Sequence, residues 1–456
     1  MKEIARRTAS VLAVLVVLPL VSCATYRARP LHPEASARSL TERNLHDPRL
    51  LRFLAIEEHR AGSPRWNLGT LTLVATYERP DMPLVAARLA EAKAGELTAA
   101  ELPNPVLSFR PSYNTTTIAP SPWKVGPVVS FLIRSFAVRP ALIARARARA
   151  AAAREAIAVT AWRLRGKVRA ALVSLWSAER TERLSVTALA IARRSRTVVS
   201  QRFNAGMVSA ADLTMATLAQ ERAQFAAAAS HRRLRLARTR LATTIELPVS
   251  ALDGVRLDLR GISRPQPPDR LGPLIHAALI RRPDVLAALA RYRAAQANLR
   301  LEIARQYPSV NIGPGYRYDQ GDNKFMLAVS LPLPILNQNQ GPIARARAAR
   351  RVAAEEFLST QARVLGQIER ARTDWKASNA ELASARRVRA SAADLLARRQ
   401  AEFDAGEIGR LRLLGAEDAF VNAEQGALVA SVHQREALGE LESALYHPFL
   451  IAAGAR

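Results

Sequence analysis

Ile143-Ala144-Arg145-Ala146-Arg147-Ala148 decides how this chain is organised, because the same six letters return at 343–348. The shift of 200 residues, from 143 to 343, holds again where Phe203-Asn204-Ala205-Gly206 corresponds to Phe403-Asp404-Ala405-Gly406. A repeat this long is a structural unit and not a short solenoid motif. The sequence therefore predicts a tandem duplication. We place the first copy at residues 66–245, a loop-rich connecting segment at 246–271, the second copy at 272–446 and a C-terminal tail at 447–456.

Each copy predicts one very long helix and a shorter return helix. The long helices span about 139–203 and 341–403, and each extends roughly 100 Å at 1.5 Å per residue. The return helices span about 210–245 and 410–446. Apolar residues at seven-residue spacing, with one skip in each copy, predict coiled-coil seams: Ile157, Leu164, Ala171, Leu184, Ile191 and Val198, then Ile368, Trp375, Leu382, Val388 and Leu395. Each long helix ends at a Phe-x-Ala-Gly turn, where glycine can adopt a left-handed cap conformation.

Shorter helices are predicted before each hairpin. Residues 68–100 read as one or two helices interrupted around Arg79-Pro80-Asp81-Met82-Pro83, because proline removes a backbone donor and clashes with the preceding turn. In the second copy a helix starts near Gly272 and contains Arg281-Arg282-Pro283-Asp284-Val285.

Two-residue alternation predicts a β-hairpin in each copy, at 105–135 and 309–333. Each hairpin has one apolar and one polar face, and aromatic residues such as Trp123 and Phe325 lie near the strand ends. Segments of about ten residues suit tilted strands of a membrane barrel, although a half-buried soluble strand shows the same pattern. Four strands cannot close a barrel, so several chains would have to share one.

The N-terminus has the pattern of a lipoprotein export signal. Lys2, Arg6 and Arg7 precede a short apolar run, which predicts a cleaved leader at 1–22. Cys23 is the only cysteine, and its position fits lipidation of a new N-terminus; the alternative is an ordinary signal peptide with an incidental cysteine. Residues 23–65 lack sustained periodicity and are predicted to be an extended tether.

Composition favours helices and argues against nucleic-acid binding. Of the 456 residues 49% are hydrophobic but only 5% aromatic, and the formal net charge is +28. Basic residues that bind nucleic acid are usually clustered among stacking aromatics or in a recognisable motif, whereas these arginines recur throughout. An exported chain would also not meet a genome.

Several ordered motifs resemble the TolC-type outer-membrane efflux proteins. They are Arg282-Pro283-Asp284, Tyr307-Pro308-Ser309, Leu331-Pro332-Leu333-Pro334-Ile335, Gln340-Gly341, Pro103-Asn104-Pro105 and both Phe-x-Ala-Gly turns. The resemblance is greatest to lipidated outer-membrane components of tripartite pumps, including the heavy-metal branch. It implies a mainly α fold with a small membrane β part. In a homotrimer, each chain would give four strands to a shared β-barrel and its duplicated coiled-coil helices to a periplasmic tunnel.

The same resemblance implies conduction and not catalysis. Such channels lie in the outer membrane of Gram-negative bacteria and work with a periplasmic adaptor (a membrane fusion protein) and an inner-membrane efflux transporter. We expect no enzyme activity, no cofactor and no metal site, because the sequence offers no phosphate-binding loop, HExxH pair or triad and its histidines are scattered.

The helix-turn-helix tips are the candidate functional site. The resemblance makes them the adaptor-contacting mouth: Phe203, Gly206, Met207, Val208 and Ser209, with Phe403, Gly406, Glu407, Ile408 and Gly409. Capped helix ends are the plainer interpretation. Asp212, Arg410 and Arg412 are candidate pore-mouth residues, and the two arginines depart from the acidic residues usual beyond the second turn. The alternative function is a lipid-anchored periplasmic coiled-coil protein without a pore; an adaptor would need a β-rich domain that the sequence does not show.

Overall fold

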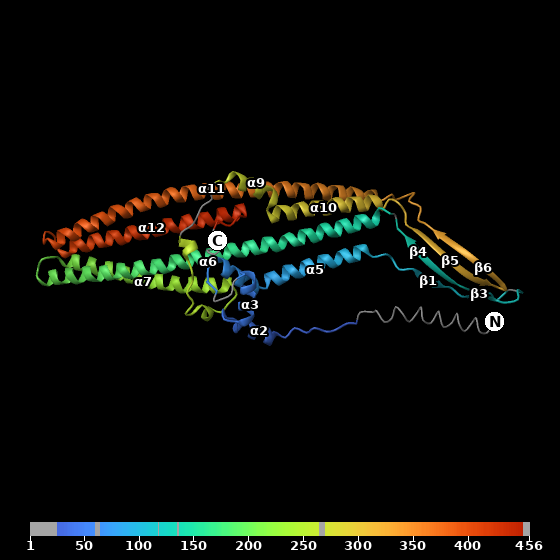
Figure 1. Ribbon diagram of the computed structural model, residues 1–456, viewed down its shortest axis with the longest axis horizontal. Coiled ribbons are helices and arrows are strands. Elements are labelled where there is room, and N and C mark those ends of the chain that lie inside the picture. Colours follow the sequence, from blue (N-terminus) through green and yellow to red (C-terminus); the bar gives the residue numbers. More distant parts are fainter. Residues whose placement is uncertain (1–24, 60–63, 117, 135, 264–269, 450–456) are drawn as a thin grey trace. The chain divides into compact units, whose positions relative to one another are not determined.

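The computed structural model describes residues 25–59, 64–116, 118–134, 136–263 and 270–449, and the chain divides into two compact units. The first unit, residues 1–43, contains the described helix α2 (Pro33–Thr41), which buries none of its residues. The second unit, residues 44–456, contains all the elements that follow (Figure 1). The predicted leader and Cys23 lie outside the described residues.

Part of the predicted extended tether is helical. Helix α3 (Pro48–Glu57) begins after Asp47, whose side chain accepts a hydrogen bond from the Arg49 backbone N–H at 2.8 Å. Leu50 and Leu54 are buried in a core with α4 and the middle of the first long helix. The prediction for this segment was wrong because a helix of ten residues, with apolar side chains at 50, 51, 53, 54 and 56, is too short a pattern to be recognised by periodicity.

Proline positions set the ends of the short helices. The predicted interruption at Arg79-Pro80 is confirmed, because α4 (Leu68–Glu78) ends and α5 (Asp81–Ala100) begins there. The helix predicted from Gly272 is divided in two, α9 (Gly272–Arg281) and α10 (Pro283–Ala304). Pro283 disfavours the helical conformation at the residue before it, and Arg282 is extended with ψ of 137°.

The predicted long helices and their return helices are confirmed. They are α6 (Val138–Asn204) with α7 (Ala210–Thr244), and α11 (Gln340–Asp404) with α12 (Arg410–Leu445). Helix α6 also packs against α12, α10 and α5, so elements of the two copies are interleaved and do not form separate bodies.

Five of the eleven predicted seam residues are buried, four are half-buried and two are exposed. Leu164, Ala171, Ile191, Ile368 and Leu382 are buried between helices. Val388 is 59% and Leu395 42% exposed, so no described helix of this chain covers them. The heptad pattern marks an apolar stripe, but it does not say which helix covers that stripe.

The two hairpins join into one antiparallel sheet. Its segments are β1 (Val106–Phe109), β2 (Ser112–Tyr113), β3 (Trp123–Val125), β4 (Pro127–Ile133), β5 (Val310–Asp319) and β6 (Asp322–Ser330). Segment β1 pairs with β4, and β2 with β3; both β4 and β3 pair with β5, which pairs with β6. The sheet therefore has four rows, and the second row of copy one contacts the first row of copy two.

Glycine and proline account for the breaks in the strands. Between β3 and β4, a Cβ atom on Gly126 would lie 1.9 Å from the Tyr316 carbonyl oxygen, so only glycine allows this approach. Segment β6 ends at Ser330 and not at the predicted residue 333, because Pro332 cannot donate to a strand ladder.

The connecting segment and the chain end pack against the helices. The connection contains η2 (Val249–Leu252) and α8 (Arg260–Ser263), and Leu247 and Ile262 are buried in the core that holds α3. Phe449, in the predicted tail, is buried in a second core with α9, α11 and α12.

Candidate functional site

The two tips share one geometry at the ends of the long helices. Gly206 and Gly406 have positive φ angles of 71° and 75°. In the first tip the Gly206 N–H donates to the Phe203 carbonyl at 2.9 Å, and the Met207 N–H donates to the Arg202 carbonyl at 2.8 Å. The second tip repeats both bonds, at 3.0 Å and 2.9 Å. This pair of bonds is the Schellman motif, and it explains why glycine recurs after 200 residues.

The starts of the two return helices differ. Ser209 and Asp212 form a capping box: the Asp212 N–H donates to Ser209 Oγ at 3.2 Å, and the Ser209 N–H donates to Asp212 Oδ2 at 2.9 Å. The equivalent positions in the second copy are Gly409 and Arg412, and no side chain caps that helix. The two copies thus share the turn, but only the first has a side-chain cap.

The predicted pore-mouth residues have different surroundings. Hydrogen bonds from Ser209 hold the pKa of the Asp212 carboxyl below its usual value. The carboxylate is therefore engaged in capping the N-terminus of α7. The Arg410 guanidinium lies 5.3 Å from the centre of the Phe403 ring, a cation–π distance. Arg412 is exposed. The two turns are neighbours, because a Cβ on Gly409 would meet Arg202 Nη2 at 3.1 Å.

The tips expose most of the predicted contact residues. Met207 is 73% and Phe203 37% exposed, and Gly206, Ser209, Gly406, Glu407 and Gly409 are also exposed. Val208, Phe403 and Ile408 are half-buried. Below the tips, Arg194 of α6 pairs with Glu417 of α12 at 2.7 Å, and Ile191, Leu414 and Val421 form a small core. The surface of the tips is thus supported by contacts between the copies.

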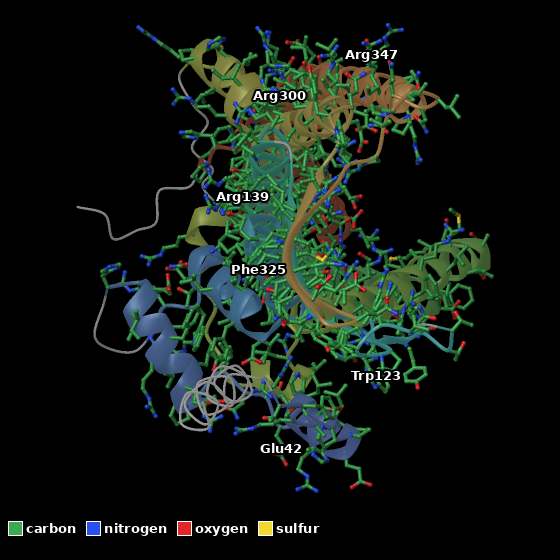
Figure 2. All side chains as sticks on the ribbon, turned by 90° about the vertical axis from the view of Figure 1, so that its right-hand side faces the viewer. Glu42, Trp123, Arg139, Arg300, Phe325 and Arg347 are labelled. Carbon is green, nitrogen blue, oxygen red and sulfur yellow. The ribbon has the colours of Figure 1, made fainter. Side chains whose placement is uncertain are left out.

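The strand sheet exposes an apolar face. On β6, Phe325, Leu327 and Val329 alternate on one side and are 89%, 65% and 57% exposed. On the first hairpin, Leu107, Phe109, Trp123 and Phe131 are each at least 47% exposed. Trp123 and Phe325, labelled in Figure 2, come from strands of different copies. Water is an unfavourable environment for so many large apolar side chains on one sheet.

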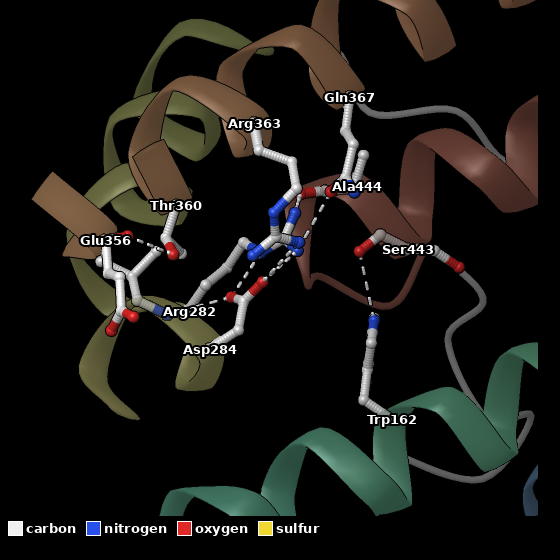
Figure 3. A network of polar contacts seen from close by, with 10 residues as sticks. Trp162, Arg282, Asp284, Glu356, Thr360, Arg363, Gln367, Ser443 and Ala444 are labelled. Carbon is white, nitrogen blue, oxygen red and sulfur yellow. Dashed lines mark hydrogen bonds and ion pairs between the residues drawn. The ribbon is translucent and has the colours of Figure 1, made fainter. Parts of the chain in front are cut away.

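Sequence reasoning missed a pair of arginine clamps. Arg282 donates to both carboxylate oxygens of Asp284, to the Ala444 carbonyl at 2.6 Å and to Gln367 (Figure 3). In the first copy, Arg79 binds Asp81 and donates to the Thr244 carbonyl at 3.2 Å. Each arginine thus caps the C-terminal end of a return helix. The signal was present in the sequence as Arg-Pro-Asp at 79–81 and again at 282–284.

The described residues contain neither an apolar helix of membrane-spanning length nor a cluster of metal-binding side chains. No helix in this part of the chain is both long enough and apolar enough to cross a bilayer. Within the same residues, no three side chains of His, Cys, Asp or Glu come together in a way that would hold a metal ion.

Part of the sequence is similar to known outer-membrane efflux proteins. Residues 274–445 match the family model for outer membrane efflux proteins. The cobalt-zinc-cadmium resistance protein CzcC of Cupriavidus metallidurans is 29% identical over 215 residues, which is 46% of this chain and 50% of CzcC. The match thus spans about half the length of this curated relative.

Solved structures extend the likeness in fold. A membrane protein from Pseudomonas aeruginosa is 22% identical with a TM-score of 0.68, covering 83% of this chain and 93% of its own. The Campylobacter jejuni CmeC outer membrane channel is 15% identical with a TM-score of 0.67, covering 93% of this chain and 92% of its own. The predicted resemblance is therefore confirmed: residues 274–445 match the family model for outer membrane efflux proteins, and most of the chain shares the fold of these solved outer-membrane and membrane proteins.

Proposed function

We propose that this protein is the outer-membrane exit duct of a tripartite efflux system. Three copies would contribute four strand rows each to one closed barrel, and their long helices would form a periplasmic tunnel. Substrates would pass through a water-filled pore, driven by an inner-membrane transporter, so this chain would perform no chemistry.

The observation that carries this proposal is the sheet of four rows with an exposed apolar face. Both edge rows, formed by β1 with β2 and by β6, have a neighbour on one side only among the described strands. In a bilayer an open edge leaves backbone groups without partners, whereas closure with neighbouring copies satisfies them. Closed cyclic symmetry is the common solution for identical chains.

We assign the tips to the periplasmic adaptor. Helices α6 and α11 run from the strands to the tips, so a sheet in the outer membrane would place the tips deep in the periplasm (Figure 1). Phe203, Met207, Glu407 and the two glycine turns would meet the adaptor there. Lipidation of Cys23 would add an anchor at the same membrane.

The similarity to CzcC indicates which cargo should be tested first. CzcC is described as a cobalt-zinc-cadmium resistance protein, so divalent metal cations are the first cargo to test for this chain. A strain that lacks the gene should then become sensitive to these metals, and the intact gene should restore resistance.

The barrel itself is tested by conductance. Purified protein should add stepwise ion conductance to a planar bilayer. Leu327→Lys should abolish most insertion, because a lysine facing lipid near the bilayer midplane costs about 2–4 kcal/mol. Ala328→Lys is the matched control, since residue 328 points to the opposite side of the same strand.

Equal insertion of both variants would show that the apolar face does not meet lipid. Complete absence of conductance from the unmodified protein, with the chain still attached to membranes, would favour the lipid-anchored coiled-coil protein without a pore.

A further inference from the structure

A hollow between α6, α11 and α12 has an excess of positive charge. Its volume is about 540 Å³, and its lining includes the arginines 180, 183, 386, 389 and 435 and one carboxylate, Glu424. Glu424 already accepts a hydrogen bond from Arg389 at 2.7 Å. Arg180, Arg183 and Arg386 form no ion pair with any described carboxylate. The hollow thus has three guanidinium groups that no described carboxylate neutralises.

Arg435 at the base of the hollow is buried and hydrogen-bonded. Arg435 is 7% exposed, and it donates to the Ile262 carbonyl at 2.8 Å and to the Ser431 carbonyl at 2.6 Å. Its guanidinium lies 4.1 Å from the centre of the Trp176 ring, and that of Arg180 lies 4.9 Å from it. The indole is thus a platform that holds two cations in place.

Within the hollow, the charged form of Arg435 is disfavoured by burial and by neighbouring arginines. Burial, together with nearby Arg180, Arg386 and Arg169, lowers the pKa of Arg435 to about 10. Like charges repel most strongly where water is excluded. An anion in the hollow would relieve this repulsion.

We propose that this hollow binds a small polyvalent oxyanion of the phosphate type. Planar guanidinium groups donate paired hydrogen bonds that match phosphate oxygens, and several together recognise a multiply charged anion. The site lies within a single chain, so it depends neither on the assembly nor on the cargo proposed above.

Titration calorimetry of the full-length protein with inorganic pyrophosphate tests the site, in buffers adjusted with chloride to one ionic strength. Saturable binding is expected. Arg183→Gln and Arg386→Gln should each weaken it about tenfold, the usual loss for one hydrogen bond to a charged group. Arg387→Gln is the matched control, because Arg387 is the exposed neighbour of Arg386 on α11 and does not line the hollow.

Chemical modification of the unmodified protein gives an independent measurement. Pyrophosphate should protect Arg183 and Arg386, but not Arg387, from an arginine-specific dicarbonyl reagent. Absence of saturable binding would overturn the proposal, as would equal effects of all three substitutions. If an acidic side chain of a second copy fills the hollow, pyrophosphate will fail to bind the assembled protein, and the proposal is also wrong.

Discussion

At the scale of single residues, the arginine of each Arg-Pro-Asp motif joins parts of the chain that are distant in sequence. Arg282 is nearly buried, and Asp284 is only 20% exposed. Replacing Arg282 with alanine would leave this carboxylate and the Ala444 carbonyl without their main donor. Removing one partner of a buried pair costs about 3–5 kcal/mol, so we expect Arg282→Ala to lower the unfolding free energy by about that amount. Denaturant unfolding measures the change.

Two comparisons make this prediction specific. Arg281→Ala removes an equal charge from the exposed neighbouring position and should have little effect. Arg79→Ala removes the corresponding clamp in the first copy, where the arginine is also bound by Glu246, and should destabilise the end of α7. If Arg281→Ala were as harmful as Arg282→Ala, the clamp would not be the cause.

The clamps also show what a sequence alone does not reveal. Arg-Pro-Asp is visible twice, and its proline correctly predicts a helix boundary at Arg79-Pro80. The acceptors, however, are carbonyls of Thr244 and Ala444, more than 160 residues further along the chain. Local periodicity carries no information about such partners, so the clamps were not predicted.

At the scale of elements, long repeated patterns were predictable and short ones were not. The four long helices follow from apolar periods sustained over many turns, and the strands follow from alternation that recurs in both copies. Helix α3 is only ten residues long, and it buries only Leu50 and Leu54 fully. The tip residues were predictable as turns because glycine with positive φ is required there; their surroundings depend on packing between the copies.

The unequal caps of α7 and α12 predict unequal responses to acid. The pKa of Asp212 is depressed in the folded protein, so its stabilising effect is complete above the unfolded value of about 3.9 and is lost as pH falls through the lower folded value. The start of α12 has arginine at the matching position and lacks this dependence. Hydrogen exchange, corrected for intrinsic rates, should show protection that is lost in acid at residues 210–214 but not at 410–414.

A substitution distinguishes the cap from general acid effects. Ser209→Ala should raise exchange at the start of α7 about fivefold at neutral pH, since an N-cap serine contributes about 1 kcal/mol. It should leave the start of α12 unchanged. Equal loss of protection at both tips on acidification would mean that the Ser209–Asp212 pair does not control the first one.

At the scale of the whole molecule, a single copy leaves apolar stripes on its long helices uncovered. On α7, Leu218, Phe225 and Leu236 are 44%, 78% and 56% exposed. With 3.6 residues per turn they lie within about 20° of one another around the helix. On α11, the predicted seam residues Val388 and Leu395 are also exposed and seven residues apart. Stripes of this kind in coiled coils are usually covered by another helix, and the proposed trimer provides one.

Phe225→Asp should therefore prevent assembly, because it would place a charge in an interface that excludes water. We expect the unmodified protein to be a trimer by light scattering in detergent and to migrate in gels as a trimer that dissociates on heating. The variant should be monomeric and should keep the helical circular dichroism of the unmodified protein. Gln224→Asp adds the same charge at an exposed position about 100° around the helix and should leave the trimer intact. If the Phe225→Asp variant is still a trimer, this stripe does not lie in the interface. If the unmodified protein is a monomer, the shared barrel is wrong, because four rows of strands cannot close a barrel alone.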